Sequence, residues 1–95
     1  PFVYRVDKLP EPQPVFRFIQ QAERMDDAEA YATFNMGVGF AAYVAERDAE
    51  ACAAAGRRAG LDAWVAGTVR KEGDRKAVDL TPLGLSYGGE SLQIR

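Results

Sequence analysis

Residues 33–45 read TFNMGVGFAAYVA, and this stretch decides how the chain is expected to fold. From residue 36 to residue 45, every second position is apolar (Met36, Val38, Phe40, Ala42 and Val44), with glycine and alanine at most positions between them. A period of two is typical of a β-strand, and a face of glycine and alanine lets a neighbouring group approach closely. The pattern predicts a strand over 36–45 with one bare face.

The residues that follow extend this strand into a larger unit. Alanine-rich sequence over 49–59 predicts a helix, with Asp48 as its N-cap and Gly60 just after its C-terminus. A further strand is expected over 63–69. A strand, a helix of this length and a second strand make the right-handed connection that joins parallel strands. We therefore expect a βαβ unit over 36–69.

The rest of the chain supplies strands and two more helices. Pro14 stands where a proline at the first helical position would, and Asp26 is a candidate cap for the second helix. Turns at 71–74 and 88–90 are expected to close two hairpins. The expected segments are strands over 2–6, 76–80, 83–87 and 91–94, and helices over 14–25 and 26–31. The prediction is an α+β fold in a single domain over 1–95, with packed helices on a mixed, mainly antiparallel sheet.

The composition excludes several kinds of catalytic site. The 95 residues contain no histidine and one cysteine, Cys52, which we expect to be buried in its helix. Ser-His-Asp and Cys-His catalysis, histidine metal sites, C-x-x-C pairs and an intrachain disulfide are therefore ruled out. The net charge is −2 and no basic stripe is present. Nucleic acid is not an expected partner, because binding to its phosphates needs clustered basic residues.

Targeting signals are also missing from the sequence. The longest uncharged run, residues 30–45, is too short and too polar to span a bilayer. No basic and apolar leader precedes the first strand, and a lone reduced cysteine fits the cytosol, so we expect a cytoplasmic protein with no membrane partner. The first residue is proline, which leads us to expect a truncated or processed chain.

The residues themselves point to one candidate ligand site. Gly37 and Gly39 fall on the same face of the expected strand, and the amide of Asn35 can both donate and accept hydrogen bonds. Such a face can admit a ligand; alternatively, the glycines allow a helix or second sheet to pack closely. No helix follows at once, so this is not a phosphate-binding glycine loop. The acidic residues at 26–29 fit a helix cap better than a magnesium site.

Residues 29–40, EAYATFNMGVGF, closely resemble a known family signature. It is the E-M-x-R-T-F-N-x-G-[IV]-G-M motif of the aminoimidazole ribonucleotide synthetase (phosphoribosylformylglycinamidine cyclo-ligase) family. The proline-rich approach before it, the helix over 48–60 and the strand over 62–67 are similar to that family as well. Ala32 stands where the family usually has arginine, and Ala30 and Phe40 stand where it has methionine.

The resemblance implies a role in ATP-dependent imidazole ring closure in purine biosynthesis. The matching part is the back of the family's C-terminal domain, which forms one wall of the cleft for a small-molecule ribonucleotide. By resemblance, the substrate-binding residues are Phe34, Asn35, Gly37 and Gly39; no catalytic residue is identified. In the reaction, ATP activates the formamide oxygen of formylglycinamidine ribonucleotide, and the neighbouring nitrogen attacks to close the ring.

The resemblance also implies partners and cofactors outside this chain. ATP and Mg²⁺ bind mainly in an N-terminal domain with an acidic, glycine-rich phosphate loop, which this chain lacks, and that family is homodimeric. We therefore expect a chain without cofactors or activity of its own. Its expected partners are an N-terminal ATP-binding domain and further copies of itself in a homo-oligomer. The alternative is a free-standing, non-catalytic module of the same fold that binds a metabolite or mediates oligomerisation.

Overall fold

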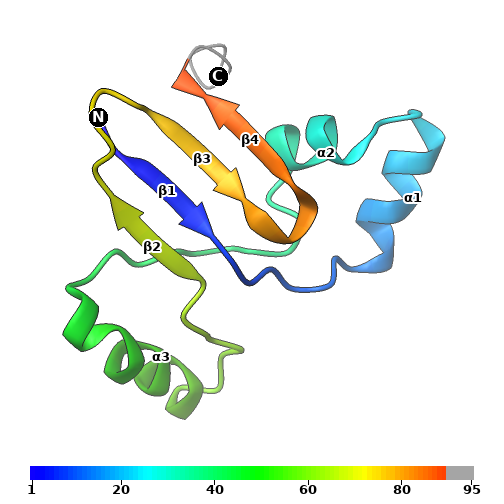
Figure 1. The fold of residues 1–95 in the computed structure, drawn as a ribbon. Helices are drawn as coiled ribbons and strands as arrows, with labels where there is room; N and C mark the ends of the chain where they lie inside the picture. The colour runs from blue at the N-terminus through cyan, green and yellow to red at the C-terminus, as the bar shows by residue number, and fades with distance from the viewer. Residues whose placement is uncertain (90–95) are drawn as a thin grey trace. The chain divides into compact units, whose positions relative to one another are not determined.

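The computed structural model describes residues 1–89, which contain four strands and three α-helices (Figure 1). In chain order the elements are β1 (Val3–Val6), α1 (Pro14–Ala22), α2 (Asp27–Thr33), the 3-10 turn η1 (Glu46–Asp48), α3 (Ala49–Arg58), β2 (Gly67–Arg70), β3 (Ala77–Leu80), the 3-10 turn η2 (Thr81–Leu83) and β4 (Leu85–Gly88). The α+β class and the mixed sheet are confirmed.

The chain divides into two compact units. The sheet unit consists of residues 1–8 and the chain from 42 onward, and the helical unit consists of residues 9–41. The sheet unit holds all four strands with α3, and the helical unit holds α1 and α2. The single domain over 1–95 stays a prediction.

The four strands form one sheet in the order β2-β1-β3-β4, with the first strand of the chain in its interior (Figure 1). β1 runs antiparallel to β2 and parallel to β3, and β3 runs antiparallel to β4. Two of the three pairings are antiparallel, as predicted. Gly67 is required where β2 meets β1, because a Cβ there would overlap the carbonyl oxygen of Arg5.

The strand predicted over 36–45 is wrong. Met36 and Gly37 have φ of 51° and 97°, so the chain turns where the strand should begin. Residues 38–45 that follow belong to no strand, and Phe40 is 87% exposed. The βαβ unit expected over 36–69 is therefore not formed, and the parallel pairing among the described strands is that of β1 with β3.

The predicted hairpins also differ from the structure. The strands expected over 63–69 and 76–80 correspond to β2 and β3, but β1 lies between them, so they do not pair with each other. Residues 63–66 precede β2 as irregular chain. β4 overlaps the strand expected over 83–87 but extends to Gly88, where a turn was predicted. It forms its hairpin with β3 through η2, whose end is marked by Gly84 at φ 65°. The strand predicted over 91–94 lies outside the described residues.

Most of the residues predicted to begin or end a helix are confirmed in that role. Pro14 occupies the start of α1, and the Asp26 carboxylate accepts a hydrogen bond of 2.9 Å from the Glu29 N–H at the start of α2. Gly60, with φ of 91°, follows the end of α3. The exception is Asp48, which closes η1 and makes no capping hydrogen bond with its side chain.

α1 ends three residues earlier than predicted. Arg24 has φ of 55°, a left-handed conformation in which its N–H bonds to Gln21 O at 3.3 Å. The N–H of Met25 bonds to Gln20 O at 2.9 Å. These two bonds make the Schellman motif that ends many helices, here with arginine where glycine is usual.

Burial is confined to small side chains and a few larger ones. In the sheet unit Val3, Ala53, Ala77 and Leu80 are buried, and in the helical unit Pro12, Ala30 and Met36 are. α1 has an apolar stripe, yet Val15 and Phe18 on it are 55% and 70% exposed. Cys52, predicted to be buried, is exposed.

One face of the sheet carries a row of polar side chains. Thr68, Arg5, Asp79 and Ser86 stand side by side in register across the four strands. Both carboxylate oxygens of Asp79 accept hydrogen bonds from Arg75, at 2.8 and 3.1 Å, and Ser86 Oγ donates to one of them at 2.7 Å. The bond from Arg75 is the main reason that the pKa of Asp79 is lowered.

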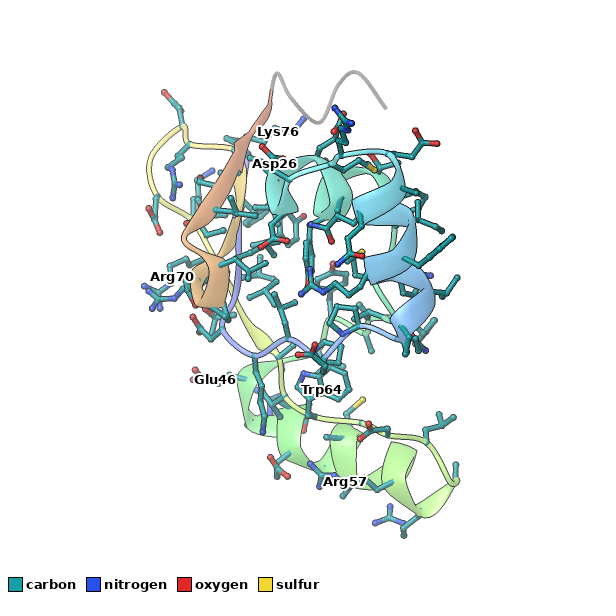
Figure 2. The ribbon with its side chains drawn as sticks, turned by 90° about the vertical axis from the view of Figure 1, so that its right-hand side faces the viewer. Asp26, Glu46, Arg57, Trp64, Arg70 and Lys76 are labelled. Carbon is teal, nitrogen blue, oxygen red and sulfur yellow. The ribbon has the colours of Figure 1, made fainter. Side chains whose placement is uncertain are left out.

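Arg57 of α3 and Trp64, which precedes β2, are labelled in Figure 2, and each makes a side-chain hydrogen bond within the sheet unit. Trp64 Nε1 donates to the carbonyl of Lys8 at 3.0 Å, and Arg57 Nε donates to the carbonyl of Ala63 at 2.9 Å. Trp64 therefore has a structural role, because its indole N–H holds the end of the β1 segment to the chain before β2.

Candidate functional site

The predicted site residues lie in a tight turn directly after α2. The N–H of Phe34 bonds to Ala30 O at 2.9 Å and ends the helix. The side-chain oxygen of Asn35 then accepts from the Gly37 N–H at 2.8 Å, and the Asn35 carbonyl accepts from the Val38 N–H at 3.1 Å. We call residues 35–38 the Asn35 turn. Asparagine favours such turns because its side chain can replace a backbone acceptor.

Met36 fixes this turn and was missed by sequence reasoning. Its side chain is only 1% exposed, and its φ of 51° is unusual for a residue other than glycine. Burial of a large apolar side chain offsets the cost of the left-handed backbone. Between Asn35 and Gly37, methionine looks like one more residue of an alternating strand, so the sequence offers no signal of this role.

The structure separates the two glycines that the sequence treats as a pair. Gly37 has φ of 97°, and a Cβ built on it would lie 2.7 Å from Oε1 of Gln13. Gly39 has no positive φ, and a Cβ there would meet no atom within 4 Å. Gly37 is therefore required by the conformation of the turn, whereas the space beside Gly39 is open.

Phe34 is engaged with another ring of the helical unit. Its ring centroid lies 6.3 Å from that of Phe16, with the planes inclined at 50°. Aromatic pairs at this separation stabilise each other beyond the area they bury. Phe34 thus supports the turn from the side of α1, and its ring is only partly accessible.

The hydrogen-bonding capacity of Asn35 is only half used. Its oxygen accepts from Gly37, and within residues 1–89 its Nδ2 has no partner. An amide nitrogen carries two donors, so the turn presents two exposed N–H groups. Residues 30–45 contain no charged side chain. The site can therefore donate hydrogen bonds to an acceptor oxygen but offers no charge of its own.

The acidic residues of α2 are used by the fold. Asp26 caps the helix, and Asp27 accepts from Gln20 Nε2 at 2.8 Å and from Arg17 at 3.1 Å. The bond from Gln20, followed by that from Arg17, lowers the pKa of Asp27. Among the residues that the structure describes, no group of three acidic or cysteine side chains could hold a metal ion.

The helical unit also has an open depression of about 290 Å³. Its lining residues are Arg17, Gln20, Gln21, Arg24 and Met25. None of the predicted site residues contributes to it, and Arg17 and Gln20 are already bonded to Asp27. We therefore place the candidate site at the Asn35 turn.

Comparison with known proteins gives a consistent result. Residues 5–79 match the family described as "AIR synthase related protein, C-terminal domain". A phosphoribosylformylglycinamidine cyclo-ligase of Methanocaldococcus jannaschii is 41% identical over 66 residues, which is 70% of this chain and 19% of the relative. The cyclo-ligase of Methanothermobacter thermautotrophicus is 55% identical over 47 residues, 50% of this chain and 14% of the relative.

The matched regions span less than a fifth of each of these relatives. No solved structure matches the chain with significant similarity. Among the helices in the described part of the chain, none has the length and apolar character needed to cross a membrane.

Proposed function

This chain belongs to the AIR synthase related protein family, whose C-terminal domain it matches over residues 5–79, and from that premise we propose a ribonucleotide-binding role. The chain forms part of the substrate cleft of a phosphoribosylformylglycinamidine cyclo-ligase-like enzyme and is inactive by itself. The substrate, formylglycinamidine ribonucleotide, binds at the Asn35 turn. The relatives that bear the cyclo-ligase name support the choice of substrate.

The proposal depends on the side-chain NH₂ group of Asn35, which makes no hydrogen bond within the described residues. Because Gly37 holds its oxygen at 2.8 Å, the Nδ2 donors are fixed in direction before a ligand arrives. A donor that is already oriented loses little entropy on binding and can position an acceptor oxygen of the substrate. The open side of Gly39 leaves room for the ligand beside the turn.

Nucleotide activation belongs to another part of the parent protein. The described residues fit neither Mg²⁺ nor the phosphates of ATP, since their acidic side chains form no metal-binding group and the Asn35 turn leads into no helix N-terminus. We assign ATP and Mg²⁺ to an N-terminal domain because of the resemblance to the cyclo-ligase family. The parent is proposed to be a cytoplasmic homo-oligomer, and this chain contributes substrate positioning.

The test is a nuclear magnetic resonance titration of the ¹⁵N-labelled 95-residue chain with formylglycinamidine ribonucleotide. Asn35 is the only asparagine in the sequence, and its side-chain NH₂ pair is told apart from those of the four glutamines by its loss in Asn35→Ala. We expect saturable shifts of this pair and of the Gly37 and Gly39 amides. Asn35→Ala should weaken binding about tenfold, the loss of roughly one hydrogen bond.

Two controls separate this proposal from its alternatives. Ribose 5-phosphate carries the sugar phosphate without the formylglycinamidine group and should bind much more weakly. With ATP and Mg²⁺ added, the isolated chain should form no ring-closed product. If formylglycinamidine ribonucleotide leaves every signal in place, the substrate assignment is wrong and the free-standing module becomes the better account.

A further inference from the structure

We propose that Gln13 is a second ligand-binding residue of the Asn35 turn, and that the two carboxamides together select an uncharged carbonyl oxygen of the ligand. This inference rests on the proposed function, because it concerns the same site. It adds a residue from the proline-rich segment before α1, which lies 22 positions upstream of Asn35 in the sequence.

The side chain of Gln13 lies against Gly37. Its Oε1, Cδ and Nε2 atoms are 2.7, 3.5 and 3.9 Å from the position that a Cβ of Gly37 would occupy. Gln13 is the N-cap residue of α1, yet its side chain makes no capping hydrogen bond. The carboxamide therefore lies over the turn and does not cap the helix.

The carboxamides of Gln13 and Asn35 converge on one glycine. Asn35 reaches the N–H of Gly37, and Gln13 lies where a side chain of Gly37 would be. Within residues 1–89, neither Nε2 of Gln13 nor Nδ2 of Asn35 has a hydrogen-bond partner. Two carboxamide nitrogens carry four N–H donors, and the absence of a Cβ on Gly37 is what lets the Gln13 carboxamide approach the turn.

This donor set indicates the chemical class of the ligand atom. A phosphate dianion is usually bound with a charged partner such as arginine, but residues 30–45 contain no basic residue and Arg17 is paired with Asp27. Uncharged donors suit a neutral acceptor, and a carbonyl of an amide type accepts two hydrogen bonds. The formyl oxygen of the ligand, and not its phosphate, is therefore placed at Gln13 and Asn35.

The test replaces Gln13 by methionine, which keeps most of the side-chain length but has no donor. Gln21→Met on the exposed side of α1 is the matched control. Each variant of the 95-residue chain is titrated with formylglycinamidine ribonucleotide, and binding is followed by the Asn35 NH₂ pair. We expect the dissociation constant to rise about five- to tenfold for Gln13→Met and less than about twofold for Gln21→Met.

A second measurement in the wild-type chain does not depend on any variant folding well. The Gln13 NH₂ signals, assigned by their loss in Gln13→Met, should shift with the same dissociation constant as those of Asn35. If the ligand shifts Asn35 but leaves Gln13 unmoved, or if Gln13→Met binds like the wild type, the inference is overturned while the proposed function stands. If the wild type binds no formylglycinamidine ribonucleotide, both fall.

Discussion

Replacing each glycine of the T-F-N-M-G-V-G segment by alanine should give opposite results at the two positions. At Gly37, alanine must adopt φ of 97°, and its Cβ would press on Gln13 Oε1 at 2.7 Å. The left-handed backbone costs a residue with a Cβ about 1–2 kcal/mol, and displacing the carboxamide from its preferred rotamer adds about 0.5–1.5 kcal/mol. Alanine also lowers the conformational entropy of the unfolded chain, which offsets about 0.4–1 kcal/mol of this destabilisation. We expect Gly37→Ala to destabilise the fold by about 1–2 kcal/mol.

At Gly39 neither cost applies. The backbone does not have positive φ, and no atom lies within 4 Å of the added methyl group. Only the unfolded-state effect remains, so Gly39→Ala should be neutral or should stabilise the chain by up to about 1 kcal/mol. Urea unfolding followed by far-ultraviolet circular dichroism measures both changes under the same conditions.

A double substitution separates the two costs at Gly37. In a Gln13→Ala background the contact is gone and only the backbone strain remains, so Gly37→Ala should destabilise the fold less than it does in the wild type. The difference should exceed about 0.3–0.5 kcal/mol, the deviation from additivity seen for independent sites. Equal effects at Gly37 and Gly39 would refute the reasoning. So would a Gly37→Ala variant as stable as the wild type.

Three further predictions concern helix ends and the sheet. Asp26→Ala should lower the free energy of unfolding by about 1 kcal/mol, while Asp26→Asn keeps the acceptor for the Glu29 N–H and most of the stability, as urea titrations of both can check. Arg24→Gly should raise the melting temperature, since relief of the left-handed arginine exceeds the added chain entropy by about 0.5 kcal/mol; an unchanged or lower melting temperature would count against that strain. The hydrogen bond from Arg75 lowers the pKa of Asp79 in the folded state. The ionised Asp79 therefore stabilises the fold above the unfolded pKa of about 3.9, and this stabilisation is lost as the pH falls through the folded pKa. The stability gap between wild type and Asp79→Asn should therefore shrink between about pH 6 and about pH 2, and a constant gap would show that the pair contributes nothing.

Local signals predicted the helices well because their causes are local. Pro14, Asp26 and Gly60 act on the residues next to them, and each lies where the sequence indicated. The end of α1 was misplaced because Met25 continues the apolar stripe although the left-handed Arg24 has already closed the helix.

The strand over 36–45 could not be judged by periodicity alone. Alternation of apolar and small residues describes an exposed extended chain as well as a strand, and glycine and alanine have weak strand preference. What decides the matter is the hydrogen bond from the Gly37 N–H to Asn35, together with the burial of Met36, and these depend on the packed structure. The same limit hid Gln13, whose contact with Gly37 joins segments far apart in sequence.

The hairpin error has a non-local cause. A turn does occur between residues 70 and 77, and it was placed correctly. Nothing near that turn reveals that β1, from the start of the chain, occupies the position between β2 and β3. The polar row on the sheet is likewise visible only once the register of Arg5 with Asp79 is known.

The interior position of β1 has a consequence for how the chain is made. During synthesis β1 leaves the ribosome well before its neighbours, since Val6 pairs with Gly67 and Val3 with Ala77. Until β2 and β3 emerge, β1 lacks both of its neighbours in this sheet, and contacts between residues so far apart in sequence form slowly. Deleting residues 3–6 would therefore remove the middle of the sheet, whereas deleting a strand at a sheet edge would leave the other pairings in place.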